Sequence, residues 1–255
     1  MRLHMKRVHL LVLLTFITTF ISAKPVDQAT PIDAWQRVLE NFVDEQGRTD
    51  FSALADSSDD LDTFVAYLGQ HGPRSEPSRY DTPDKVLAFH INAYNALAMH
   101  GVIDKGIPNA FDSILKRAGF FKFRQVEVDG MRMSLSAYEN DIIRPLGDAR
   151  VHFALNCMVR DCPRLPRIPF TAATLDAQLQ TQAREFFSHT KHLRLSSTQK
   201  RVQVSRILEF YTDDFASSGK REDLIPYINQ FRDEAIPQDW ELEFLDYDWT
   251  VNHQP

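Results

Sequence analysis

One short segment, VHFALNCMVRDCP (Val151 to Pro163), contains both cysteines of the chain together with a histidine and an asparagine. A histidine close to a cysteine is the minimum needed to activate a thiolate, and an asparagine can orient the imidazole. If the segment starts as a strand, His152 and Asn156 lie on the same side of it, with the small Ala154 between them. These residues predict a catalytic group in which His152 is the base, Cys157 the thiol and Asn156 an orienting amide.

Four residues separate the two cysteines, and this spacing allows three interpretations. In an oxidising compartment Cys157 and Cys162 would form a disulfide, which is the state we expect. Zinc accepts Cys, His and Asp ligands, and Cys157, Cys162, His152 and Asp161 could supply them, but the tight C-x2-C spacing is missing. A reactive thiol is the third alternative. We predict no metal site and no cofactor.

A second polar group lies within the apolar segment KVLAFHINAYNALAMHGVI. Asn92 and Asn95 are three residues apart and therefore share one face of the predicted helix. They line a cleft as catalytic amides, or they bond to the backbone of neighbouring loops, as most buried polar side chains do. We assign Tyr94 to substrate binding.

Acidic and aromatic residues elsewhere complete the predicted site. Glu139, Asp246 and Asp248 are the candidate partners of His152, and each alone could equally be a solvated surface acid. We assign Glu139, Trp249 and Asp248 to substrate binding, although Trp249 could also be a core residue of a closing strand. The patterns of serine hydrolases, zinc proteases and nucleotide-binding loops are missing from the sequence.

The elements expected to position these residues are helices and hairpins in no regular βαβ order. Helical spacing and stop signals predict helices over residues 30–46, 60–68, 82–105, 136–144, 171–187, 207–215 and 222–231. Asp129-Gly130 predicts a two-residue hairpin turn, and residues 192–205 predict a second hairpin. Residues 151–155 are predicted as a short buried strand, and residues 240–252 have strand character. We expect a single α+β domain with a central buried helix packed on short, mostly antiparallel strands and hairpins.

The N-terminus has the layout of a secretory signal peptide. Arg2, Lys6 and Arg7 precede an uncharged apolar run, and Ile21-Ser22-Ala23 fits a cleavage site. We therefore predict a signal peptide over residues 1–23, export to the periplasm or outside the cell, and no membrane span after its removal; the alternative is an uncleaved anchor. Cleavage removes three basic residues and no acidic one, which changes the net charge from −6 to −9. An acidic chain has no electrostatic reason to bind nucleic acid.

Several segments together resemble a known family: KVLAFHINAYNALAMHGVI, VHFALNCMVRDCPRL, FTAATLDAQLQTQAREFF, SRILEFYTDDF and YDWTVN. Their order and spacing are similar to those of the family catalogued as domain of unknown function 547. The resemblance implies a main domain over residues 80–252, and we expect residues 24–79 to form an N-terminal helical extension packed on it. His90 stands where the family typically has tryptophan, and Val159 and Asp161 stand at positions that usually carry small or hydroxyl-bearing residues.

Two functions remain open at this stage. The first is an exported hydrolase or acyl transferase, broadly like papain-like or transglutaminase-like enzymes, with His152 as base. The second is a non-catalytic exported module that binds a small molecule, peptide or glycan, with Cys157–Cys162 as a structural disulfide.

Overall fold

The protein is described by a computed structural model that covers residues 30–216 and 218–255. The predicted signal peptide lies outside these residues. The helices in chain order are α1 (Pro31–Phe42), α2 (Phe51–Asp56), α3 (Asp59–Gln70), α4 (Pro83–Asp104), α5 (Ile114–Arg117), the π-helix η1 (Ala118–Phe123), α6 (Leu135–Ala137), the π-helix η2 (Tyr138–Ile143), the 3-10 helices η3 (Arg144–Leu146) and η4 (Ala149–Phe153), α7 (Leu175–Ser188), α8 (Ile207–Phe210), α9 (Thr212–Phe215), the 3-10 helix η5 (Arg221–Asp223) and α10 (Leu224–Asn229). The strands are β1 (Gln125–Val128), β2 (Met131–Ser134), β3 (Leu193–Ser196), β4 (Arg201–Val204) and β5 (Glu241–Phe244). This is the predicted α+β fold.

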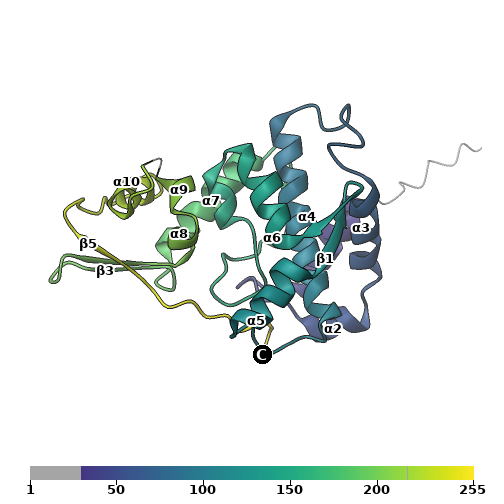
Figure 1. Ribbon diagram of the computed structural model, residues 1–255, viewed down its shortest axis with the longest axis horizontal. Coiled ribbons are helices and arrows are strands. Elements are labelled where there is room, and N and C mark those ends of the chain that lie inside the picture. Colours follow the sequence, from purple (N-terminus) through teal and green to yellow (C-terminus); the bar gives the residue numbers. More distant parts are fainter. Residues whose placement is uncertain (1–29, 217) are drawn as a thin grey trace, which may run out of the picture.

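The molecule has a larger helical part and a smaller part that contains the three-stranded sheet (Figure 1). Each part has its own cluster of buried hydrophobic residues, one built around α4 and the other around α7, β4 and α10. The 3-10 helix η4 joins them, because Val151 is buried in the first cluster and Phe153 in the second. The ends of η4 therefore lie where the two parts meet.

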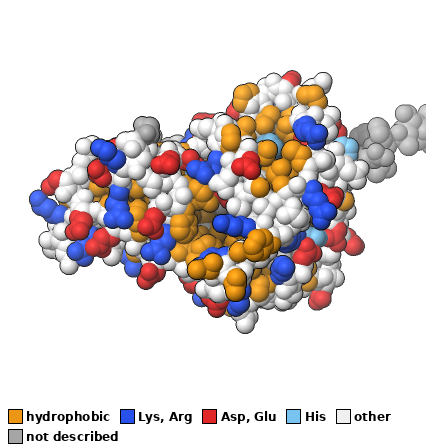
Figure 2. All heavy atoms as spheres, viewed as in Figure 1, with side chains coloured by type: hydrophobic (Ala, Val, Ile, Leu, Met, Phe, Trp, Pro, Cys, Tyr) orange, Lys and Arg blue, Asp and Glu red, His pale blue; other side chains and the backbone are white. Residues whose placement is uncertain are grey.

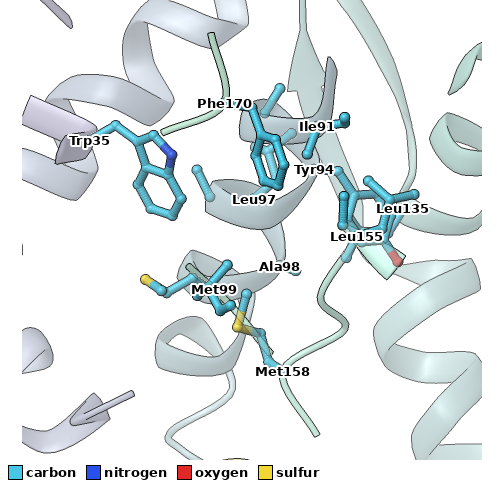
Figure 3. Close-up of a cluster of buried hydrophobic side chains, with 14 of the residues drawn as sticks. Trp35, Ile91, Tyr94, Leu97, Ala98, Met99, Leu135, Leu155, Met158 and Phe170 are labelled. Carbon is cyan, nitrogen blue, oxygen red and sulfur yellow. The ribbon is translucent and has the colours of Figure 1, made fainter. Parts of the chain in front are cut away.

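The central helix α4 forms as the sequence predicts. The Thr82 side chain accepts a hydrogen bond from the backbone N–H of Lys85, and Pro83 occupies the first helical position. Almost every residue from Leu87 to Val102 is buried. Figure 3 shows apolar side chains of α4 among others from α1, α6 and the segment after η4. Among the described helices, α4 alone has the length and composition of a membrane span, which is also typical of a core helix buried in the protein.

Both predicted hairpins are present. β1 and β2 pair antiparallel, with Val128 opposite Met131 across a turn made by Asp129 (φ 52°) and Gly130 (φ 71°). Positive φ at both turn positions is typical of a type I′ turn, which suits the twist of the two strands. β3 and β4 also pair antiparallel, while β5 adds to β4 in parallel. The pairing is thus mostly, but not entirely, antiparallel.

The predicted strand over residues 151–155 is wrong, because these residues belong to the 3-10 helix η4 and the turn after it. The Asp148 side chain accepts a hydrogen bond from the N–H of Arg150, and the N–H of Val151 donates to the Asp148 carbonyl. These local bonds take up backbone groups that a strand would pair with a neighbour. Smaller differences are the start of α6, which Ser134 caps instead of Ser136, and the start of α7 at Leu175.

The segment after β5 returns from the smaller part to the larger one (Figure 1). Single β-bridges pair Val251 with Val159, Thr250 with Ala110 and His253 with Thr49. Residues 245–250 therefore pass along the junction of the two parts before the chain pairs with the larger part.

Candidate functional site

The side chains of Asn92, Asn95 and Asn156 form hydrogen bonds that hold the backbone of neighbouring segments in place. The Asn92 carbonyl accepts hydrogen bonds from Trp35 Nε1 (3.2 Å) and the Phe170 N–H (3.0 Å), and its amide donates to the Phe170 carbonyl (2.8 Å). Because both ends of the amide are occupied, the catalytic role predicted for Asn92 is not supported.

Asn95 and Asn156 act together on the segment after η4. Asn95 donates to the Ala154 carbonyl (3.0 Å) and accepts from the Asn156 N–H (2.7 Å). The Asn156 side chain donates to the Pro163 carbonyl and accepts from the Met158 N–H, both at 2.7 Å. These two amides hold the disulfide loop on α4, which for Asn95 is the backbone-bonding alternative.

Cys157 and Cys162 form the expected disulfide, with an S–S distance of 2.08 Å. A sulfur in a disulfide is neither a nucleophile nor a zinc ligand. The prediction of Cys157 as a catalytic thiol is therefore wrong for this structure, and so is the alternative of a zinc site that uses both cysteines. The disulfide closes the loop that carries Met158, whose positive φ of 64° marks a tight turn.

A pocket of about 140 Å³ lies at the junction of the two parts, and Figure 2 shows hydrophobic side chains gathered in the hollow there. Aromatic rings make up much of its wall, joined by a few polar groups and by Cys157. The lining residues are Phe121, Ser136, Glu139, Asn140, His152, Leu155, Cys157, Pro163, Ile207, Phe210, Tyr211, Tyr247 and Trp249. They come from η1, α6, η2, η4 and α8, from the loops that follow these elements, and from the returning C-terminal segment.

His152 is almost completely buried at this pocket, and Asp214 holds one side of its ring. His152 Nε2 lies 2.7 Å from Asp214 Oδ2, and Arg144 donates to the same carboxylate from Nε (2.7 Å) and Nη2 (2.8 Å). Burial alone would raise the pKa of the Asp214 carboxyl, but the hydrogen bonds from His152 and Arg144 outweigh burial and lower the pKa well below the usual range of Asp. Asp214 is therefore ionised, and His152 Nε2–H is the donor. The ring also stacks on Tyr211, with 3.9 Å between centroids.

The other nitrogen of His152 faces Glu139. Nδ1 lies 3.9 Å from Glu139 Oε1, while the Tyr94 hydroxyl donates to Oε2 over 3.1 Å. Burial, followed by the charge of Glu139, raises the pKa of both the Tyr94 and Tyr211 hydroxyls well above 10. Both phenols stay protonated and can donate hydrogen bonds beside this buried carboxylate.

The predicted site residues thus divide into two groups. The pocket is lined by His152, Cys157, Glu139 and Trp249, and Tyr94 supports it through Glu139. Asp248 does not line the pocket: its carboxylate accepts the Thr250 N–H (2.9 Å). Its predicted role in substrate binding is therefore not supported.

Among the site residues that sequence reasoning missed are Arg144, Phe210, Tyr211 and Asp214. The partner of His152 was expected among Glu139, Asp246 and Asp248, yet its short hydrogen bond goes to Asp214, 62 residues along the chain. The available signal was the segment SRILEFYTDDF, which resembles the family and contains the acidic pair Asp213 and Asp214.

Comparison with known proteins gives one match. Residues 78–187 match the family described as "Protein of unknown function, DUF547". The match includes Glu139 and His152, while Tyr211, Asp214 and Trp249 lie beyond it. Searches of curated proteins and of solved structures found no match. Residues 78–187, which include the asparagine-bearing helix and the disulfide segment, are therefore similar to the DUF547 family.

Proposed function

We propose that this protein is a hydrolase or acyl transferase that works by acid–base chemistry at His152, without a thiol. One observation carries the proposal: a buried imidazole lies between two carboxylates at a pocket, with Asp214 at 2.7 Å from one nitrogen and Glu139 at 3.9 Å from the other. Oriented histidine–carboxylate pairs of this kind supply general bases in many hydrolases.

The orientation of the ring determines which nitrogen can react. Because Nε2–H donates to Asp214, neutral His152 carries its lone pair on Nδ1. The 3.9 Å from Nδ1 to Glu139 is too long for a direct hydrogen bond. Nδ1 can therefore accept a proton from a water, alcohol or amine bound in the pocket.

In the proposed reaction this bound molecule attacks the carbonyl carbon of a substrate. Its oxygen or nitrogen forms the new bond to carbon, its proton moves to His152 Nδ1, and the bond to the leaving group breaks. The leaving group then takes the proton from Nδ1. The charges of Asp214 and Glu139 on either side stabilise the imidazolium that forms in between.

The pocket limits the size of the reacting group. A cavity of about 150 Å³ holds benzene in a well-studied engineered protein, and the pocket here has about 140 Å³. The aromatic wall of Phe210, Tyr247 and Trp249 favours an apolar or ring-shaped group. We therefore expect the substrate to insert a short acyl or aromatic group and to keep the rest of its structure outside.

A binding module is the second candidate, and the disulfide favours it. With both sulfurs paired and the three amides bonded to backbone, the pocket keeps few groups for chemistry. In this alternative the aromatic rings and Glu139 would bind a small molecule or the end of a peptide or glycan without turnover.

Export to the periplasm or outside the cell is also a proposal. The disulfide supports it, because such bonds persist in oxidising compartments. The basic and then apolar N-terminal sequence supports it independently.

Turnover of small chromogenic esters and anilides, from acetyl to benzoyl, tests the proposal. We expect His152→Gln to lower kcat/KM by about 100-fold or more, as loss of a general base does. Glu139→Gln should lower kcat while the fold is kept, because Gln can still accept the Tyr94 hydroxyl.

Glu40→Gln, an exposed substitution on α1, is the matched control and should leave turnover unchanged. Thermal unfolding of each variant shows whether lower turnover results from loss of the catalytic base or from loss of the folded structure. Full turnover in a folded His152→Gln protein would exclude His152 as the base. A ligand that binds the pocket without being turned over, with equal affinity for wild type and His152→Gln, would favour the binding module.

A further inference from the structure

A projecting segment next to the pocket exposes large hydrophobic side chains. We call residues 113–124, which include α5 and η1, the α5–η1 tip. Leu115 is 81% exposed, Ile114 77% and Phe123 72%, the three highest values among the exposed large hydrophobic residues of the described chain. Hydrophobic side chains gather low on the face in Figure 2, where Figure 1 places α5. Water is a poor environment for three such side chains so close together.

The backbone of the tip is held firmly, so the exposure is not that of a loose loop. Phe120 is buried against Phe111, with 4.4 Å between ring centroids. Ser113 caps α5 by accepting the Lys116 N–H, and Arg117 donates to the Phe111 carbonyl over 3.1 Å. The fold therefore holds the apolar side chains outward.

The tip is also basic, in contrast to the rest of the chain. Residues 114–124 contain Lys116, Arg117, Lys122 and Arg124 and no acidic residue, in a protein with a net charge of −6. Lys116 pairs with Asp112 (2.9 Å) and Arg124 with Asp104 (2.6 Å). Within the described residues Lys122, directly before Phe123, forms no ion pair. Two of the four charges are thus compensated by acids, while Lys122 keeps its positive charge directly beside the exposed Phe123.

This combination fits a lipid surface better than a protein surface. Protein interfaces are depleted in lysine, whereas segments that enter the membrane interface combine Lys or Arg with Phe and Leu. Anionic headgroups attract the lysines, and the apolar side chains enter the boundary between headgroups and acyl chains. We propose that the α5–η1 tip docks on an anionic lipid bilayer through Ile114, Leu115 and Phe123.

This docking surface is independent of the acid–base function proposed above, but the two are adjacent. Phe121 lines the pocket and belongs to the same π-helix as Phe123. Arg117 lies over the ring of Trp249, 4.8 Å from its centroid, on the pocket wall. A docked tip would bring the pocket close to the bilayer surface.

Sedimentation with sucrose-loaded vesicles tests the proposal. The protein is purified as the cell processes it, and all variants share its N-terminus. We expect binding to vesicles of 70% phosphatidylcholine and 30% phosphatidylglycerol, weaker binding to pure phosphatidylcholine, and loss of binding as salt rises from 0.1 to 0.5 M.

Two sets of variants locate the contact. The triple change Ile114→Ser, Leu115→Ser and Phe123→Ser should lower the partition coefficient at least tenfold. Lys122→Gln should lower it about fivefold, the equivalent of the roughly 1 kcal/mol that one basic residue gains near an anionic surface. The matched control replaces Leu146, Ile168 and Leu195, which are exposed elsewhere, by Ser and should bind like wild type.

Three outcomes would overturn the proposal. Absence of binding to anionic vesicles would do so, and so would equal binding by the tip variant and wild type. The third is a wild-type dimer, seen by light scattering, that the tip substitutions dissociate; this would identify the tip as an interface between two copies of the chain.

Discussion

His152 shows how neighbours define the chemistry of one side chain. Its ring lies between two carboxylates and against Tyr211, and only Nδ1 remains for a ligand. Arg144 keeps Asp214 ionised, and a continuous row of polar groups runs from Arg144 through Asp214 and His152 to Glu139. Asp214 in turn fixes the orientation of the His152 ring.

A second buried histidine, His90, lacks such partners and should make stability depend on pH. Its Nδ1 lies 2.7 Å from the Tyr138 hydroxyl, and burial lowers its pKa to about 4, although the charge of Asp129 acts against this change. The folded protein therefore keeps His90 neutral at a pH where the unfolded chain, with a His pKa of about 6.5, binds a proton. Stability is fully present above about pH 6.5 and is lost as the pH falls toward 4.

We predict that His90→Gln removes this dependence. Gln can still bond to the Tyr138 hydroxyl but does not titrate. Between pH 7 and pH 5 the wild type should lose about 2 kcal/mol more of its free energy of unfolding than the variant, as the linkage of a single histidine requires. Urea unfolding at the two pH values measures the difference, and identical losses in both proteins would contradict the assignment.

At the residue scale, the sequence predicted which polar residues lie at the centre of the fold better than it predicted the groups to which they bond. The helix carrying Asn92 and Asn95 and the segment carrying His152 are both central, as expected. Periodicity indicates which side chains are buried. The hydrogen-bond partner of a buried amide or imidazole depends instead on which distant segments of the chain the fold brings next to it. Asp214 reaches His152 across 62 residues, and no local spacing encodes that contact.

Among the elements, the β1–β2 hairpin shows a turn that also holds a helix end in place. Asp129 is buried, and its carboxylate accepts the N–H groups of Arg74 (2.5 Å) and Ser75 (2.9 Å). The N–H groups of Asp129 and Gly130 donate to the carbonyls of Leu68 and Gly69 near the end of α3. The hairpin turn therefore docks on α3 and on the loop after it.

We predict that Asp129→Ala lowers the free energy of unfolding by about 3 kcal/mol, because two N–H groups lose their acceptor and Ala must adopt a positive φ. Asp129→Asn should cost about half as much, since it keeps one acceptor and tolerates this φ. Urea unfolding compares the two variants. If Asn were as costly as Ala, the backbone bonds would not be the cause.

Element prediction succeeded where local signals were strong. The Thr82-Pro83 start of α4 and the Asp129-Gly130 turn are encoded by neighbouring residues. It failed for η4, where alternating Val151, Phe153 and Leu155 resemble a strand. Residues 151–156 are all buried, because the 3-10 helix lies between two hydrophobic clusters, and the period of so short an apolar run does not distinguish it from a buried strand.

At the scale of the whole molecule, the C-terminal residues connect segments that are distant in sequence. The Thr49 N–H donates to the Asn252 carbonyl (3.0 Å), and Gln254 Nε2 donates to the carbonyls of Phe42 and Arg48. The Asn252 N–H donates to the Met158 carbonyl within the disulfide loop. The C-terminal segment thus stabilises the larger part after it has left the smaller one.

We predict that deletion of residues 251–255 exposes the Thr49 amide. Its protection against hydrogen exchange should fall at least tenfold, because its acceptor is removed. The Asp129 amide, which donates to the Leu68 carbonyl, is the control and should stay protected if the rest of the fold persists. Unchanged protection at Thr49 would mean that the C-terminal bridge contributes nothing to this end of the molecule.

The path of the returning segment also affects the order of assembly during translation. Tyr247 and Trp249, which form one wall of the pocket, leave the ribosome long after α4 and the disulfide loop. Chains fold as they emerge, N-terminal parts first. The core around α4 can therefore collapse while the pocket still lacks a wall. A nascent chain stalled before residue 245 would carry His152 but no closed site.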